Sequence, residues 1–118
     1  MTVQTKETQS LLTPDAALNL LKEGHQRFLD KQPLDRDLHA QVSATSEGQF
    51  PFAAVLGCID SRVPVETIFD LGIGDIFTPR VAGNIVNEDI LGSLEYACKV
   101  AGSKLIVCLL YTSPSPRD

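Results

Sequence analysis

Three residues with chemically active side chains stand on alternate positions in the segment GCIDSRVP, residues 57–64: Cys58, Asp60 and Arg62. In an extended chain, residues two apart share a face, so the thiol and the carboxylate can point at one ion. A thiolate and a carboxylate are half of a tetrahedral zinc site, and Arg62 can hold the Asp60 carboxylate in one rotamer. The spacing therefore indicates a candidate metal site.

The same spacing is open to two other interpretations. Cysteine is among the most buried residues and exposed ion pairs are common, so Cys58 can be a core filler beside a surface pair of Asp60 and Arg62. A nucleophilic cysteine of the phosphatase type needs an arginine six positions further on, where Pro64 stands. Spacing disfavours the nucleophile and leaves the metal site and the core filler open.

The elements that must position these residues alternate between strands and helices. Strands are expected in the apolar runs PFAAVLGCI, GDIFTPRV and KLIVCLL, which are residues 51–59, 74–81 and 104–110. Such alternation requires crossover connections, so the sequence predicts an α/β fold with a parallel-sheet core and flanking helices. In an open parallel sheet the reactive site lies beyond the carboxyl ends of the strands, which is where residues 58–62 stand.

Helix signals separate the expected strands. Thr13 and Pro14 are typical of a helix start, and apolar residues at spacings of three and four follow until Gln32-Pro33. A second helix is expected from Asn87 to Ala101, and a short helix or turn in VPVETIFDLG, residues 63–72. Residues 1–12 are expected to be a flexible lead, and residues 33–50 a loop with a short helical turn.

Composition limits the class of protein. The formal net charge is -5, and Lys and Arg are scattered, so the sequence excludes the basic surface expected of a nucleic-acid-binding protein. No apolar run has the length of a secretory signal or a membrane span, so we expect no membrane partner and predict a cytoplasmic protein. Three cysteines in a reducing compartment are more often core fillers, ligands or nucleophiles than disulfide halves.

Two motifs together identify a family that this sequence resembles. C-I-D-S-R at 58–62, followed by R-V-A-G-N at 80–84, resembles the β-class carbonic anhydrases, whose signature is C-x-D-S-R and then R-x-A-G-N. The segment LKEGHQRF at 21–28 also looks like the family's amino-terminal helix, and the similarity runs from about Ala16 to Val107. The resemblance implies an α/β fold of that family and a zinc lyase that converts carbon dioxide reversibly to bicarbonate.

The resemblance also implies roles for the individual site residues. Cys58 corresponds to the first thiolate ligand of Zn²⁺, while Asp60 and Arg62 correspond to the family's catalytic dyad. In an open site Asp60 pairs with Arg62 and orients the zinc-bound water, and in a closed site its carboxylate itself binds the metal. Zinc would lower the pKa of that water to about 7, and the resulting hydroxide would attack carbon dioxide. Family members are dimers or larger homo-oligomers, with the amino-terminal helix packing across a neighbouring subunit.

The family's remaining ligands do not follow the third expected strand. Members place a His and a Cys there, in a G-H-x-x-C segment, whereas this chain reads CLLYTSPSPRD at residues 108–118. His25 lies on the apolar stripe of the first helix and His39 in polar loop, so neither is expected to bind metal. Cys98, on the apolar stripe of the second helix, is expected to be core.

Residues 108–118 have a simple explanation at the level of DNA. The peptide can be back-translated into a sequence that resembles a transposase adapter used in sequencing libraries. We therefore expect a flexible lead at 1–12, a truncated carbonic anhydrase domain at 13–107 and an artefactual tail at 108–118. The chain alone is expected to be inactive, and the competing hypothesis is a non-catalytic fragment or metal-free binding module of the same fold.

Arg80 has two possible roles in this resemblance. In some members the corresponding arginine joins a second, regulatory bicarbonate site, together with a Trp three residues before the first ligand cysteine. Here that position is Val55, and the chain has no Trp. The sequence therefore favours a structural role for Arg80, in which it supports the loop Ala82-Gly83-Asn84.

Overall fold

The centre of the molecule is a parallel sheet, seen in a computed structural model that describes residues 3–109. Among these residues the strand order is β2-β1-β3, with β1 at Ala53–Leu56, β2 at Ile76–Phe77 and β3 at Ile106–Cys108. β2 and β3 both pair in parallel with β1, which requires crossover connections. The predicted parallel α/β fold is confirmed, although the strands are shorter than the apolar runs.

Helices form where the sequence supplies caps and one apolar face. Thr13 caps the first helix of the predicted pair by accepting a hydrogen bond from the N–H of Ala16, and Asn87 caps the second by accepting one from the N–H of Ile90. The helical segments of the described chain are α1 Lys6–Leu11, α2 Pro14–Leu29, α3 Leu38–Ala44, α4 Val65–Ile68, η1 Ala82–Asn84, α5 Glu88–Glu95 and the π-helical turn η2 Tyr96–Val100.

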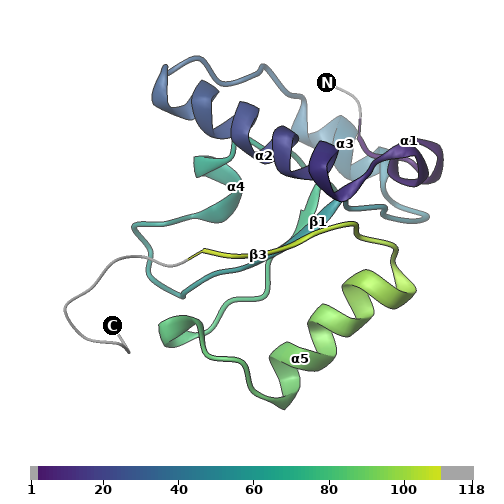
Figure 1. The fold of residues 1–118 in the computed structure, drawn as a ribbon. Helices are drawn as coiled ribbons and strands as arrows, with labels where there is room; N and C mark the ends of the chain where they lie inside the picture. Colours follow the sequence, from purple (N-terminus) through teal and green to yellow (C-terminus); the bar gives the residue numbers. More distant parts are fainter. Residues whose placement is uncertain (1–2, 110–118) are drawn as a thin grey trace.

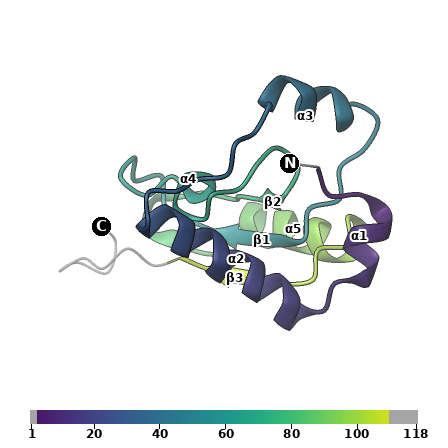
Figure 2. The same ribbon diagram turned by 90° about the horizontal axis from the view of Figure 1, so that it is seen from above.

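The sheet is covered on both faces, as Figures 1 and 2 show, with α2 on one side and α5 on the other. Every residue of β1 is buried, because alternate side chains enter two different cores. One core joins α2 and α4 to β1, and the other joins α5 to the opposite face; their buried members are Ala17, Leu21, Phe52, Ala53, Val55 and Val65 in the first, and Ala54, Leu56, Ile90, Leu94 and Ala97 in the second. Burial on both faces explains why this strand reads as a continuous apolar run.

The prediction of a flexible lead at 1–12 is wrong for residues 6–11, which form α1. Its start is closed by a capping box between Thr5 and Thr8. Its contact with the core is Gln9, a buried side chain whose Nε2 donates to the carbonyls of Pro51 at 2.8 Å and Ala101 at 2.7 Å. Both acceptors are distant in sequence, so the local pattern could not reveal this attachment.

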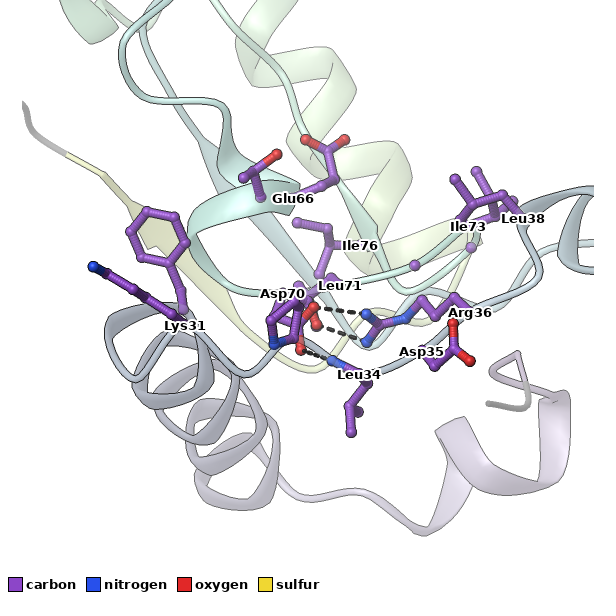
Figure 3. Close-up of a pocket in the computed structure, with 15 residues that line it drawn as sticks. Lys31, Leu34, Asp35, Arg36, Leu38, Glu66, Asp70, Leu71, Ile73 and Ile76 are labelled. Carbon is purple, nitrogen blue, oxygen red and sulfur yellow. Dashed lines mark hydrogen bonds and ion pairs between the residues drawn. The ribbon is translucent and has the colours of Figure 1, made fainter.

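A buried carboxylate, Asp70, joins the segment after α2 to the turn after α4. Its Oδ2 accepts from Arg27 Nε at 2.6 Å and from the N–H of Leu34 at 2.9 Å, and its Oδ1 accepts from Arg36 Nη1 at 2.8 Å. Figure 3 shows Arg36 and Leu34 converging on Asp70. Burial raises the pKa of Asp70, but the hydrogen bonds from Arg27, Leu34 and Arg36 outweigh burial, so the pKa lies below its usual value.

The second predicted helix, residues 87–101, buries only some of its apolar residues. Ile90, Leu94 and Ala97 are buried, but Leu91 is exposed and Cys98 is half-buried, so the prediction of Cys98 as a core residue is wrong. The helix continues into the π-turn η2 after Glu95, within which Ala97 remains buried. No helix within residues 3–109 is long and apolar enough to cross a membrane.

The expected artefactual tail at 108–118 falls almost wholly outside the described residues. Cys108 is the last residue of β3, where it pairs with Leu56, so it continues a strand as the sequence predicted. Leu109 is the last described residue, and its N–H donates to the carbonyl of Leu56 at 2.8 Å. Residues 110–118 lie outside the part of the chain that the structure describes.

Candidate metal site

Cys58 and Asp60 lie in the loop that follows β1, at the carboxyl end of the sheet. Gly57, just before this loop, forms an isolated parallel bridge with Arg80, which follows β2. Its N–H donates to the carbonyl of Pro79 at 2.9 Å, and its carbonyl accepts from the N–H of Val81 at 3.1 Å. The bridge brings the two motifs of the sequence, residues 58–62 and 80–84, next to each other.

Cys58 presents a half-buried thiol to backbone N–H groups. The N–H of Gly83 donates to its Sγ at 3.4 Å. This hydrogen bond and a second one from the N–H of Asp60 lower the pKa of Cys58, against the opposing effects of burial and of the Asp60 charge. Backbone donors favour the thiolate, which is the form that binds metal.

Asp60 and Arg62 form the ion pair that the sequence predicted. Arg62 Nη2 lies 2.5 Å from Asp60 Oδ2, and Arg62 Nε lies 2.9 Å from Oδ1, so the guanidinium engages both carboxylate oxygens. The N–H of Arg62 also donates to Oδ1 at 2.9 Å. The hydrogen bonds from the Arg62 side chain and N–H hold the pKa of Asp60 at about 2. Asp60 is therefore ionised at neutral pH.

Replacing Arg62 by glutamine should raise the pKa of Asp60 from about 2 toward its usual value of 3.8, because the guanidinium is the first cause of the shift. The measurement is a titration of the Asp60 carboxyl carbon by NMR in the metal-free protein. Arg27→Gln, which removes an arginine paired with Asp70, is the matched control and should leave the Asp60 titration unchanged. An unchanged pKa in Arg62→Gln would contradict the geometry.

Arg80 has a structural role, but the expectation that it supports the loop Ala82-Gly83-Asn84 is wrong. Its Nε donates to the carbonyl of Cys58 at 2.7 Å, and its Nη2 donates to the carbonyl of Asp60 at 2.9 Å. The contacts arise because the bridge to Gly57 places Arg80 beside the end of β1. Arg80 therefore holds the loop that carries the candidate site.

Gly83 and Asn84 are two residues whose contacts the sequence interpretation missed. Both have positive φ, 75° and 57°, so the chain turns sharply and brings the Gly83 N–H to Cys58. Asn84 Nδ2 donates to the carbonyls of Leu56 and Leu109, at the ends of β1 and β3. The Gly-Asn dipeptide was the available signal, because it is typical of backbone with positive φ.

The donors meet the chemical preferences of zinc but do not complete its coordination. A thiol with a lowered pKa and a carboxylate are both zinc ligands, and a structural or catalytic site needs at least three protein ligands. Within residues 3–109, no group of three His, Cys, Asp or Glu side chains could hold a metal ion. Among the described residues, Cys58 and Asp60 are therefore candidate donors only, and they number fewer than a zinc site needs.

The two histidines are not part of this loop, since His25 lies in α2 and His39 in α3. His25 Nδ1 lies 2.9 Å from the carbonyl of Ile68, and its ring stacks on Phe28 with centroids 6.0 Å apart. His39 is exposed in α3 rather than in a loop. His25 is a packing residue between α2 and α4.

A cavity of about 960 Å³ opens elsewhere, between residues 31–38, α4 and the start of β2. Figure 3 shows its apolar lining, including Leu34, Leu71 and Ile76, next to the Asp70 ion pairs. Its lining does not include Cys58, Asp60 or Arg62. The cavity is therefore separate from the loop that carries the candidate metal donors.

Comparison with known sequences agrees with the motifs. Residues 53–111 match the sequence model of a family described as carbonic anhydrase. The chain is 44% identical over 101 residues to "Carbonic anhydrase 2" of Mycobacterium tuberculosis, and 44% identical over 102 residues to a carbonic anhydrase of Mycolicibacterium smegmatis. Each alignment covers 85% of this chain and 49% of the relative, so the chain spans about half the length of these proteins.

Solved structures give the same result at the level of the fold. A tetrameric β-carbonic anhydrase from Sordaria macrospora aligns with a TM-score of 0.55 and 27% identity, over 80% of this chain and 45% of that one. A β-carbonic anhydrase from Aspergillus fumigatus aligns with a TM-score of 0.53 and 31% identity, over 80% of this chain and 44% of that one. The similarity thus covers most of this chain and less than half of each relative.

Proposed function

Because this chain belongs to the β-class carbonic anhydrase family, we propose that it is part of a zinc enzyme that reversibly hydrates carbon dioxide to bicarbonate. The observation that carries this proposal is the pairing of Asp60 with Arg62 two residues from the Cys58 thiol. A core-filling cysteine would need neither the N–H groups directed at its sulfur nor a paired carboxylate beside it. The remaining ligands would come from residues of a longer protein.

In this proposal each site residue has a role that its contacts support. Cys58 would bind zinc as a thiolate, which the N–H of Gly83 already favours. Asp60, ionised and held by Arg62, would accept a hydrogen bond from the reacting water and orient it toward carbon dioxide. Arg62 would keep that carboxylate turned away from the metal. When bound, zinc would supply Lewis-acid activation of the water.

A second candidate is a metal-free binding module of the same fold. Its support is the incomplete donor set, because residues 3–109 contain no group of three metal-ligating side chains. One thiolate and one carboxylate should hold zinc weakly. We therefore propose that the 118-residue chain by itself has little or no hydratase activity, whichever candidate is correct.

We also propose that the longer protein forms a homo-oligomer. The relative from Sordaria macrospora is described as tetrameric. Within residues 3–109, large apolar side chains on α5 and η2 are exposed, among them Leu91, Tyr96 and Val100. Apolar surface of this kind is typical of contacts between subunits.

The function is tested by replacing Cys58 in the product of the intact gene, obtained by sequencing the source DNA beyond the codon for Val107. We expect that product to contain zinc and to hydrate carbon dioxide, and Cys58→Ser to lose both, because one of its few ligands is removed. Metal content is measured by elemental analysis, and hydration by stopped-flow with a pH indicator.

Cys98→Ser is the matched control, because Cys98 is also half-buried but lies on η2 rather than in the loop after β1. It should keep both zinc and activity. A reading frame that truly ends in SPSPRD would favour the metal-free module. Robust turnover by the 118-residue chain alone would refute the proposal that it lacks a complete site.

A further inference from the structure

Arg80 is fixed beside the candidate site by its own backbone and by the stem of its side chain. The bridge to Gly57 places its Cα next to the end of β1. A Cβ added to Gly57 would lie 3.7 Å from Arg80 Cγ, so the aliphatic stem packs against this glycine. The guanidinium therefore reaches the Cys58–Val63 loop from the segment that follows β2, and not from the loop itself.

The guanidinium of Arg80 donates to several carbonyls of this one loop. Besides the carbonyls of Cys58 at 2.7 Å and Asp60 at 2.9 Å, its Nη2 lies 3.5 Å from the carbonyl of Val63. The Asp60 carbonyl also accepts from the N–H of Val63 at 3.2 Å, which closes a turn. Hydrogen bonds from a charged donor are about twice as strong as neutral ones, so these contacts should restrain the loop strongly.

Arg80 differs from Arg27, Arg36 and Arg62 in the acceptors of its hydrogen bonds. Arg62 pairs with Asp60, and Arg27 and Arg36 pair with Asp70. Among residues 3–109, the ion pairs do not include Arg80, whose bonds go to peptide carbonyls. The hydrogen bonds of Arg80 thus go to the backbone, whereas the side-chain hydrogen bonds to the Asp60 carboxylate come from Arg62.

The direction of the Cys58 carbonyl has a consequence for the Cys58 sulfur. All peptide bonds in the described chain are trans, so the N–H of each peptide points opposite to its C=O. Because Arg80 draws the Cys58 carbonyl to itself, the N–H of Ile59 in the same peptide faces away from Arg80. The sulfur in turn accepts a hydrogen bond from the N–H of Gly83 at 3.4 Å.

We propose that Arg80 is the positioning residue of this site: by binding the carbonyls of Cys58 and Asp60 it sets the loop so that the Cys58 sulfur meets the Gly83 N–H. The proposal deepens the proposed function, because it assigns the residue that orients the first zinc ligand. It concerns geometry that exists without metal, so it can fail or succeed independently of zinc binding and of catalysis.

The test is amide exchange with water, measured by NMR in the metal-free 118-residue chain. Arg80→Met keeps a stem of similar length and removes the donors. We expect the N–H groups of Gly83 and Val63 to exchange about tenfold faster or more, as loss of a charge-assisted hydrogen bond implies. The N–H of Leu34, which donates to Asp70, should change less than about twofold, within the additivity expected of distant sites.

Arg27→Met is the matched control, because Arg27 is also half-buried but donates to Asp70. It should speed exchange at Leu34 and leave Gly83 and Val63 unchanged. Arg80→Lys retains a positive charge without the planar fork, so it should give exchange rates between those of wild type and Arg80→Met.

Two results would overturn the proposal. If Gly83 and Val63 exchange at wild-type rates in Arg80→Met, the loop does not depend on the guanidinium. If Leu34 accelerates as much as Gly83, Arg80 stabilises the whole fold and positions nothing in particular. Should Arg80→Met fail to fold, Arg80→Lys decides the matter, since wild-type exchange at Gly83 in that variant would also overturn the proposal.

Discussion

Replacing Asp70 by alanine should lower the free energy of unfolding by about 3–5 kcal/mol, which is the usual cost of removing one partner from a buried ion pair. Asp70 is only 7% exposed and accepts hydrogen bonds from Arg27, Arg36 and the N–H of Leu34. Its removal leaves Arg36, whose side chain is 9% exposed, without its ion-pair partner. The measurement is equilibrium unfolding in urea.

Backbone conformation adds to the cost of this substitution. Asp70 has a φ of 47°, a left-handed conformation that Asp and Asn tolerate better than Ala. Asp70→Asn keeps that tolerance and one of the two acceptor oxygens, but loses the charge and the other acceptor, so it should destabilise less than Asp70→Ala. Asp30→Ala, which removes an exposed carboxylate bonded to Gln26, should change stability by less than about 0.5 kcal/mol.

The pH dependence of the free energy of unfolding separates the contribution of the Asp70 charge from that of the side chain's shape. Because the folded pKa is lowered, the stabilisation exists above the unfolded value of about 3.9 and is lost as pH falls through the folded pKa. The difference in stability between wild type and Asp70→Asn should therefore narrow below about pH 4. A constant difference across this range would show that the carboxylate charge is not what Arg27 and Arg36 require.

Replacing Gly24 by alanine should destabilise the protein by about 2 kcal/mol, although alanine is the better helix former. A Cβ at this position of α2 would lie 1.8 Å from the carbonyl oxygen of Phe69. Because the obstacle is backbone at the end of α4, relief requires that the helix or the turn move. A contact this close to backbone calls for the upper end of the usual overpacking cost, about 3 kcal/mol, of which the gain in helix propensity recovers about 1 kcal/mol.

Gly92 is the matched control for this prediction, because it also lies inside a helix but has open space around it. A Cβ there would meet nothing within 4 Å. Gly92→Ala should raise the free energy of unfolding by about 0.5–1 kcal/mol, in the opposite direction to Gly24→Ala. If both variants were more stable than wild type, the result would contradict the close contact between α2 and the Phe69 carbonyl.

Local sequence patterns predicted the elements that depend on local forces. α2 was recognised because Thr13, Pro14 and an apolar stripe act within one helix, and β1 because it is apolar on both faces. α1 was missed, since its sequence KETQSL carries no such stripe. Its attachment through Gln9 to Pro51 and Ala101 spans 42 and 92 residues, and no periodicity encodes such contacts.

In the candidate site, too, local contacts were predicted and contacts between distant residues were not. The pairing of Asp60 with Arg62 was predicted correctly, because residues two apart cannot separate far and their charges attract. The acceptors of Arg80 were predicted wrongly, since its place depends on the bridge between Gly57 and Arg80 across two strands. The contact of Gly83 with Cys58 depends on the same bridge and on a turn with positive φ.

The sequence by itself determined the alternation of strands and helices after residue 13, the family and the local ion pair, because these follow from side-chain periodicity, motif spacing and chain connectivity. Only the tertiary structure decided three contacts. α1 is attached to the core through Gln9, Asp70 forms ion pairs with two arginines, and Arg80 donates a hydrogen bond to the loop that contains Cys58. The physical reason is that such contacts join residues far apart in the chain. They form once the parallel sheet has brought its strand ends together.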